Sequence, residues 1–192
     1  MEFILYYHGE LLSNGSARHK HEIRKQFHRQ LKVLWDKKPL NRFTRFLQAE
    51  PPEALKIDEK ENWMSLIRPR GAYQFAPLVS EQLHLVAGLD VFILQPSEQG
   101  KILTQSADID NRLKTLFDAL QMPDENQTPE GNPDFDEDPF FCVLENDRLI
   151  TKVSIETGTL LEPTDKASEV RLFIKVIVKP TQFTFANADI GL

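Results

Sequence analysis

Charged side chains at helical spacing open the stretch "DIDNRLKTLFDAL", where Asp108, Asp110 and Lys114 have the chemistry of a divalent-cation site. Farther along the chain, Glu145 and Asp147 interrupt an otherwise apolar run. A carboxylate among apolar neighbours needs hydrogen bonds, a lysine or a metal, because an unpaired buried charge is costly. Hard oxygen ligands select Mg²⁺ or Mn²⁺ over zinc. These residue types therefore predict a magnesium or manganese site that is shared by a helix and a strand.

The helix that must position the first three residues is predicted over Asp108–Leu120. Its apolar residues fall on one face, and Asp108 is placed to cap the N-terminus. Asp110, Lys114 and Asp118 form a second stripe beside that face. A capping aspartate and an Asp-Lys pair are also ordinary helix stabilisers, typically worth about 1 kcal/mol or less each. The apolar face consists of Ile109, Leu113, Leu116, Phe117 and Leu120.

The strand that must supply the other carboxylates is predicted within 142–156. At a period of two, Asp147 shares a side with Leu149, Val153 and Ile155, which is the side expected to meet the helix. Other patterns indicate strands at 3–7, 82–94 and 168–179, a helix at 21–35, a short helix at 42–48 and an irregular segment at 68–77. Strands and helices follow one another without regular alternation. We therefore expect an α+β fold with a mixed sheet packed by helices.

Length and composition limit the class of protein further. A chain of 192 residues fits one domain, 1–192. The lone Cys142 excludes a disulfide framework and a cysteine zinc site, which suits a reducing cytoplasm. Apolar runs are too short to cross a bilayer, and "MEFILYYHGELL" lacks the basic start of a signal peptide, so we expect a cytoplasmic protein with no membrane partner.

Charge is distributed unevenly along the chain. The net charge is -6, yet Arg18 to Arg45 carries ten Lys or Arg against Glu22 and Asp36, whereas 121–139 carries seven acids and no base. A basic helix face on an acidic body predicts either a polyanion-binding surface or a solvated face. The candidate DNA-contacting residues are Arg24, Lys25, Arg29 and Lys32.

Two further patterns give weaker indications of a binding site. His21 and His28 on the same helix are expected to be solvated or to contact phosphate rather than to bind a metal. The acids of "DFDEDPFFCVLE" follow the spacing of a calcium loop, but Pro139 stands where that loop needs glycine.

The motif Asp108-x-Asp110-Asn111-x-x-Lys114, continuing to "DAL" and followed by Asp147 in "ENDRLI", resembles the RusA-like Holliday junction resolvases, a family of crossover junction endodeoxyribonucleases. The resemblance covers mainly 107–156. The acid pair of the family is here Asn146-Asp147, with Glu145 as a substitute, and the acidic loop 121–139 is longer than the family's turn.

The resemblance implies an α+β homodimer that cuts phosphodiesters of branched DNA with Mg²⁺ or Mn²⁺. Asp108, Asp110 and Asp147 would hold the metal, with Glu145 as a fourth candidate ligand. Lys114 would stabilise charge in the transition state, so that the expected catalytic residues are Asp108, Asp110, Lys114 and Asp147. The competing hypothesis is a catalytically degenerate RusA-like module that binds DNA or a partner protein.

Overall fold

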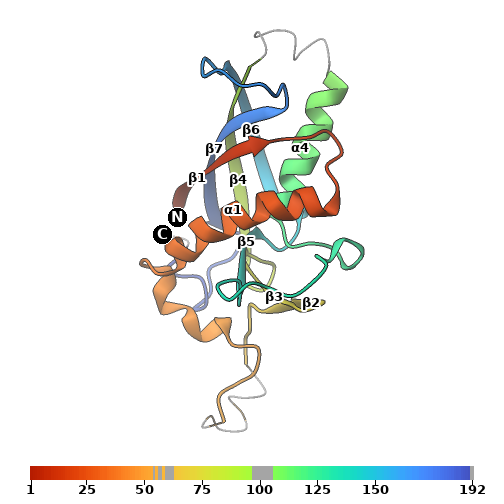
Figure 1. Cartoon of the computed structure of the whole chain (residues 1–192). Coiled ribbons are helices and arrows are strands. Elements are labelled where there is room, and N and C mark those ends of the chain that lie inside the picture. Colours follow the sequence, from red (N-terminus) through yellow and green to blue (C-terminus); the bar gives the residue numbers. More distant parts are fainter. Residues whose placement is uncertain (54, 56–57, 59–62, 97–105, 191–192) are drawn as a thin grey trace.

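Two β-sheets lie on either side of the helix α1 (Ala17–Trp35), as Figure 1 shows. The computed structural model describes residues 1–53, 55, 58, 63–96 and 106–190, and it leaves the side chains of 106–108 undescribed. Within these residues the chain is a single α+β domain with mixed sheets, which confirms the expected fold class. No described helix is long and apolar enough to span a membrane.

The larger sheet has the order β1-β7-β4-β6 and carries most of the core. It consists of β1 (Glu2–Glu10), β7 (Glu169–Pro180), β4 (Leu85–Gln95) and β6 (Ile150–Thr159). β7 pairs antiparallel with β1 and β4, whereas β4 and β6 are parallel. The alternation of β7 is as predicted, because every second residue from Val170 to Val178 is buried against the helices.

The smaller sheet has the order β2-β3-β5 and corrects the prediction of an irregular segment at 68–77. It consists of β2 (Arg68–Arg70), β3 (Tyr73–Val79) and β5 (Phe140–Leu144). β3 is buried almost throughout, so its sequence shows no polar alternation. Pro77 is tolerated in this strand because β2 pairs only with residues 73–75.

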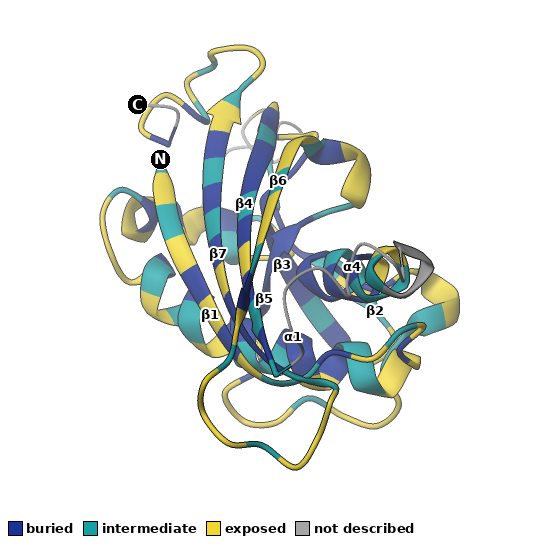
Figure 2. Cartoon of the chain, turned by 90° about the horizontal axis from the view of Figure 1, so that it is seen from above, coloured by how far each residue is buried: buried dark blue, intermediate teal, exposed yellow. Residues whose placement is uncertain are grey.

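The helices pack on the inner side of the larger sheet. α1 begins at the N-cap Ser16, whose Oγ accepts a hydrogen bond from the His19 amide at 3.2 Å. α4 (Ser106–Leu120) contacts α1 and β5. Figure 2 shows that the buried parts of α1 and α4 face the strands. The predicted helix at 21–35 is thus confirmed, and the weak segment after it contains the short helices η1 (Leu40–Arg42) and η2 (Thr44–Leu47).

Two connections matter for the candidate site. The acidic loop 121–139 contains the short helix η3 (Glu125–Gln127) and leads from α4 to β5. The short helix η4 (Asp147–Leu149) then carries the chain from β5 in the smaller sheet to β6 in the larger one.

Candidate functional site

The polar stripe of α4 consists of Asp110, Lys114 and Asp118, and only Asp118 is ion-paired among the described residues. Asp118 forms an ion pair with Lys20 at 2.7 Å, and both side chains are largely shielded from solvent. Asp110 and Lys114 are exposed, and within the described part of the chain neither has an ion-pair partner. The ordinary Asp-Lys helix pair is therefore not formed. The carboxylate of Asp110 and the ammonium of Lys114 remain available to a ligand.

Asp108 lies inside α4 rather than at its N-cap. The helix begins at Ser106, two residues before Asp108, so the predicted capping role is wrong. The Asp108 side chain lies outside the described residues, and its role as a metal ligand stays a prediction.

The strand position predicted for Asp147 is also wrong. β5 ends at Leu144, and Asp147 begins η4, where its side chain is exposed. The side chain of Asn146 caps this turn by accepting a hydrogen bond from the Arg148 amide at 3.1 Å. The two-residue period fails here because the chain must leave one sheet and enter the other. Asp147 is nevertheless an exposed carboxylate, and no ion pair of the described residues involves it.

Glu145 is already engaged by two hydrogen bonds. One carboxylate oxygen accepts from Nε of Arg68 at 2.9 Å, and the other accepts from the Glu81 amide at 3.0 Å. These bonds connect the end of β5 to β2 and to the segment after β3. A metal ligand at this position would have to break a half-buried ion pair, which is costly.

The described acids do not by themselves form a metal site. No group of three His, Cys, Asp or Glu that could hold a metal ion occurs among the described residues. The predicted set of Asp108, Asp110 and Asp147 includes one undescribed side chain. The donor chemistry suits Mg²⁺, because Asp110 and Asp147 offer exposed carboxylate oxygens without a competing cation.

A small cavity of about 140 Å³ adjoins the unpaired part of α4. It lies between α4 and the loop that follows β1, where the Gly15 amide donates a hydrogen bond to Thr115 Oγ1 at 2.9 Å. Asn111 and Lys114 bring amide and ammonium donors to it, whereas Lys20 and Asp118 in its wall are paired with each other. Such donors suit an anionic oxygen. Lys20 and this loop carry no sequence signal of a site beyond a basic segment and the turn sequence "SNGS".

Arg24 does not face solvent, which corrects its predicted contact with DNA. The residue is 2% exposed. Its Nε donates to the Gln121 carbonyl at 2.8 Å, and its Nη2 donates to the Asp118 carbonyl at 2.7 Å. These carbonyls end α4, where the helix dipole also favours a cation. Burial lowers the pKa of Arg24. Arg24 therefore joins α1 to the end of α4.

The acidic loop contacts two more of the residues that were predicted to bind DNA. Lys25 forms ion pairs with Asp134 at 3.0 Å and Glu137 at 2.9 Å. Partial burial lowers the pKa of Lys25, but hydrogen bonds to Glu137 and Asp134 outweigh it and raise the pKa above its usual range. Lys32 donates to the Asp136 carbonyl at 2.9 Å. Of the four predicted residues, Arg29 is the one that is exposed.

His21 and His28 on α1 are both buried, which corrects the expectation that they are solvated. His28 uses both ring nitrogens, because Nε2 lies 3.1 Å from the Asp136 carbonyl and Nδ1 accepts from the Phe141 amide at 2.8 Å. His21 uses neither. His28 therefore fastens the acidic loop to α1, whereas the role of His21 is not explained by the hydrogen bonds around it.

A scan against protein-family models and a search of curated protein sequences both found no match to this chain.

Proposed function

We propose that this chain is a Mg²⁺-dependent endonuclease that hydrolyses phosphodiesters of branched DNA, in the manner of the RusA-like Holliday junction resolvases, and that it acts as a homodimer. The proposal rests on the motif of Asp108, Asp110, Asn111 and Lys114. The observation that carries it is that Asp110 and Lys114 stay exposed and unpaired, while the neighbouring Asp118 is neutralised by Lys20. An unpaired carboxylate and an unpaired ammonium one helical turn apart can bind a metal cation and a phosphate oxygen next to each other.

In this proposal Asp108, Asp110 and Asp147 hold Mg²⁺, or Mn²⁺ in its place. The metal would act as a Lewis acid on the phosphodiester. Lys114 contributes a positive charge where negative charge develops on the phosphate. Asn111, which lines the same cavity as Lys114, orients the phosphate oxygens. Because both oxygens of Glu145 already accept hydrogen bonds, we assign Glu145 to support of the strand end rather than to the metal.

The DNA would approach along the side of α1 that carries Arg29 and Lys32. The Asp136 carbonyl that Lys32 contacts is uncharged, so it leaves the positive charge of Lys32 unneutralised. Arg24 belongs to the core, and Lys25 is held by the acidic loop, so both are left out of the DNA contacts. The surface offered to phosphate is smaller than the basic sequence suggests. Fewer phosphate contacts imply a weaker dependence of binding on salt.

A cleavage assay tests this proposal. Four-way junction, fork, flap and linear duplex are incubated with the protein and Mg²⁺, under single-turnover conditions. We expect cleavage of the branched substrates, lost by on the order of a thousandfold in Asp110→Asn because a metal contributes several kcal/mol. Lys114→Ala should lower the turnover rate more than the affinity for Mg²⁺. Asp124→Asn, an exposed acid of the loop, is the matched control and should cleave normally.

A second candidate is the catalytically degenerate module that binds DNA or a partner protein. It is favoured by the absence of a three-acid group among the described residues and by the engagement of Glu145. This module would bind a four-way junction without cutting it, and Asp110→Asn would not alter its binding. Cleavage by the wild-type protein that disappears in Asp110→Asn would reject it.

A further inference from the structure

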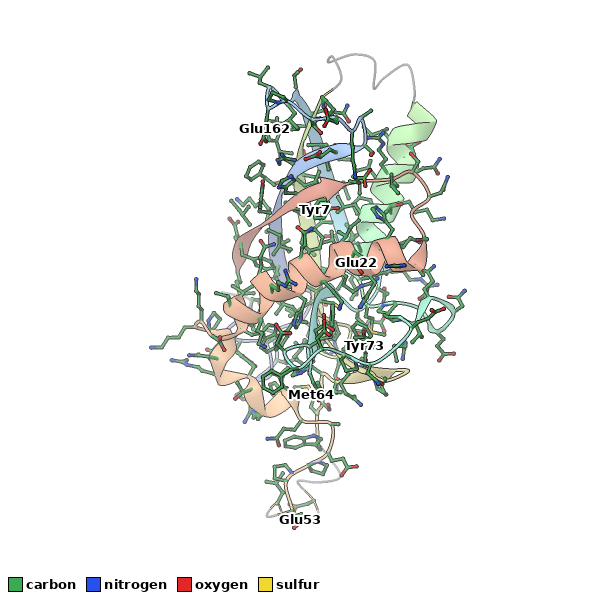
Figure 3. The ribbon with its side chains drawn as sticks, viewed as in Figure 1. Tyr7, Glu22, Glu53, Met64, Tyr73 and Glu162 are labelled. Carbon is green, nitrogen blue, oxygen red and sulfur yellow. The ribbon has the colours of Figure 1, made fainter. Side chains whose placement is uncertain are left out.

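The larger sheet has an outer face that points away from α1 and α4. Figure 3 shows Tyr7 of β1 between this strand and α1, where its ring centroid lies 6.0 Å from that of Phe27. Successive side chains of a strand point to opposite faces, so Tyr6 points away from the helices. Figure 2 shows the resulting alternation of exposed and buried residues along β1. The register of the four strands then fixes which side chains share the outer face.

An aromatic row crosses the middle of the outer face. Tyr6 of β1 is level with Phe173 of β7, and Phe173 is level with Phe92 of β4. The ring centroids of Tyr6 and Phe173 lie 5.2 Å apart. The three residues are 39% to 41% exposed, and Ile4 beside them is more exposed still. A monomeric protein rarely leaves a contiguous apolar surface open to water, so this row indicates contact with a partner.

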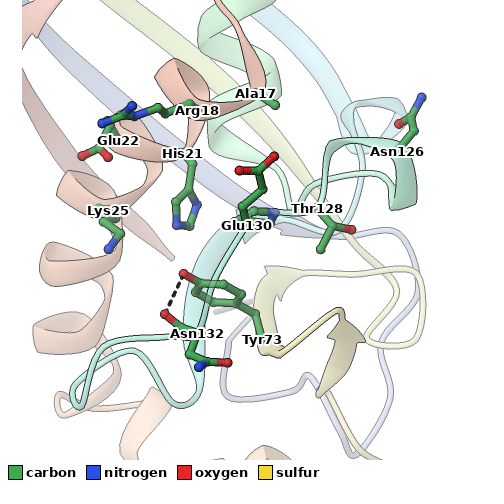
Figure 4. A pocket seen from close by; sticks show the side chains of 11 residues that line it. Ala17, Arg18, His21, Glu22, Lys25, Tyr73, Asn126, Thr128, Glu130 and Asn132 are labelled. Carbon is green, nitrogen blue, oxygen red and sulfur yellow. Dashed lines mark hydrogen bonds between the residues drawn. The ribbon is translucent and has the colours of Figure 1, made fainter.

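The rings of the outer face differ from those around the cavity in Figure 4. That cavity, of about 640 Å³, lies between α1, β3 and the acidic loop. Tyr73 in its wall is 2% exposed, and its hydroxyl donates to the Asn132 carbonyl at 3.3 Å, which is the dashed line in Figure 4. The ring of His21 is packed between Tyr73 and Phe140. These rings contact one another, whereas those of the sheet are open to a partner.

Charged residues beside the aromatic row alternate in sign from β1 to β6, in the order Glu2, Lys175, Asp90 and Lys152. Lys175 and Asp90 are register partners, while Glu2 and Lys152 are level with each other one step farther along the strands. Glu2 pairs with Lys175 at 2.7 Å, and Asp90 pairs with Lys152 at 3.0 Å. The four charges cancel, so the centre of this face offers no excess of positive charge to a phosphate backbone.

The order of these charges is complementary to itself when the sheet is turned over. A twofold axis parallel to the strands, between β7 and β4, would place β1 opposite β6 of a second copy and β7 opposite β4. Glu2 would then face the partner's Lys152, and Lys175 would face the partner's Asp90. An axis perpendicular to the strands at the same level would instead set Lys175 against the partner's Lys175. The charges therefore favour the parallel axis.

The aromatic row is complementary in the same arrangement. Phe173 would face the partner's Phe92, which buries the exposed rings against one another. Tyr6 would bring its hydroxyl to the partner's Glu156, the exposed β6 residue that is level with Phe92. A carboxylate is a strong acceptor for such a hydroxyl.

Large side chains meet small ones in the neighbouring rows. Ile177 would face the partner's Gly88, and Ile4 would face the partner's Ser154. Four rows on four strands cover roughly 500 Å² of each copy, given the usual spacing of strands and residues. Two copies would thus bury about 1,000 Å², which reaches the lower limit of a specific interface.

We propose that the outer face of the larger sheet binds the same face of a second copy of this chain, with the twofold axis parallel to the strands. The two sheets form a sandwich in which the strand directions differ by about 30°. The inference rests on the homodimer of the proposed function, but it requires neither metal nor DNA.

Analytical ultracentrifugation of the full chain without metal or DNA tests the interface. We expect the wild type to form dimers at micromolar concentration. Phe173→Glu places a carboxylate at the centre of the interface, so the dissociation constant of the dimer should rise at least about a hundredfold. Phe135→Glu alters an exposed aromatic residue of the acidic loop and should form dimers as the wild type does.

Two charge reversals test the orientation of the copies. Lys175→Glu and Asp90→Arg each set like charges against each other, so each variant alone should dimerise at least about tenfold more weakly than the wild type. An equimolar mixture should regain dimers. In the mixed dimer the two introduced side chains face each other with opposite charges, and the unchanged Lys175 of one copy faces the unchanged Asp90 of the other.

Melting temperatures of the variants near that of the wild type show that the fold is kept. A monomeric wild type, a dimer that persists in Phe173→Glu, or a mixture of the charge variants that stays monomeric would each overturn the proposal. Single-stranded DNA that binds a monomeric wild type but not Phe173→Glu would show that the aromatic row stacks on bases instead. A dimer that does not cleave branched DNA would reject the nuclease and keep the interface, whereas cleavage by a monomer would reject the interface alone.

Discussion

The charged side chains of α1 and those of α4 differ in whether they are paired within the protein. On α1, Arg24 is buried against the end of α4, and Lys25 is paired with the acidic loop. On α4, Asp110 and Lys114 remain exposed without ion-pair partners among the described residues. A basic run in a sequence therefore does not define a binding surface when the same chain supplies the opposite charges. The residues left unpaired are the stronger candidates for function.

This difference in charge pairing follows from the burial of the side chains. The half-buried Lys25 and the buried carboxylate of Glu137 lie where an unpaired charge would lose hydration, so pairing stabilises them. Asp110 and Lys114 keep their hydration at the surface, where an ion pair would contribute little. The acidic loop thus contributes to the core, while Asp110 and Lys114 on α4 remain available to ligands.

The largest expected effect on stability is that of Arg24→Met. It removes two hydrogen bonds from a cation to the last carbonyls of α4, and each such bond contributes about 2 kcal/mol. We expect the free energy of unfolding to fall by about 4 kcal/mol in urea titrations. Arg29→Met on the exposed side of the same helix should change it by less than about 0.5 kcal/mol. Equal effects of the two substitutions would remove the distinction between core and surface arginines on α1.

A smaller effect concerns His21 and pH. Burial lowers the pKa of His21 in the folded state to about 4, below the ordinary value of about 6.5 for histidine, so the unfolded chain binds the proton more readily. The stability that is linked to neutral His21 is therefore complete above about pH 6.5. As the pH falls toward 4, the free energy of unfolding decreases by up to about 3 kcal/mol. His21→Phe should flatten this part of the pH profile in thermal unfolding. The pKa values of His19 and His28 are also lowered by burial, so part of the slope should persist. A profile identical to that of the wild type would show that His21 is not the responsible group.

The smallest effect is expected from the double substitution Asp134→Asn with Glu137→Gln. Losing the partners of Lys25 should cost about 2 kcal/mol of stability, because the exposed Asp134 contributes little and the buried carboxylate of Glu137 contributes most of the pairing energy. If the protein binds DNA, the freed lysine can reach a phosphate. The slope of the logarithm of the binding constant against the logarithm of salt concentration should then become steeper by about one. Asp124→Asn with Glu125→Gln, in the exposed part of the same loop, serves as the control. An unchanged salt slope in both proteins would show that Lys25 lies away from the DNA even when it is free.

The local elements could be predicted because their patterns are local. β7 has one buried face, and α1 and α4 have apolar stripes, so their periods of two and 3.6 are visible in the sequence. β3 was missed because both of its faces are buried and Pro77 resembles a strand breaker. Asp147 was placed in a strand because the apolar pattern continues through η4, although the chain changes sheets there.

The pairing of charges could not be predicted, because it joins residues far apart in the sequence. Arg24 meets the Gln121 carbonyl across 97 positions, and Arg68 meets Glu145 across 77. No local period records such contacts. The stripe of Asp110, Lys114 and Asp118 could be predicted, since it follows from the position of the apolar face on the same helix, but the pairing of Asp118 with Lys20 could not.

Calorimetric titration with Mg²⁺ tests most directly whether the exposed carboxylate of Asp110 on α4 belongs to a metal site. The wild-type protein is compared with Asp110→Asn and with Glu22→Gln, which removes an exposed carboxylate on α1. We predict that the wild type and Glu22→Gln bind Mg²⁺ and are stabilised by it against heat, whereas Asp110→Asn shows neither effect. Absence of Mg²⁺ binding by the wild type, or equal binding by Asp110→Asn, would contradict the assignment of this site.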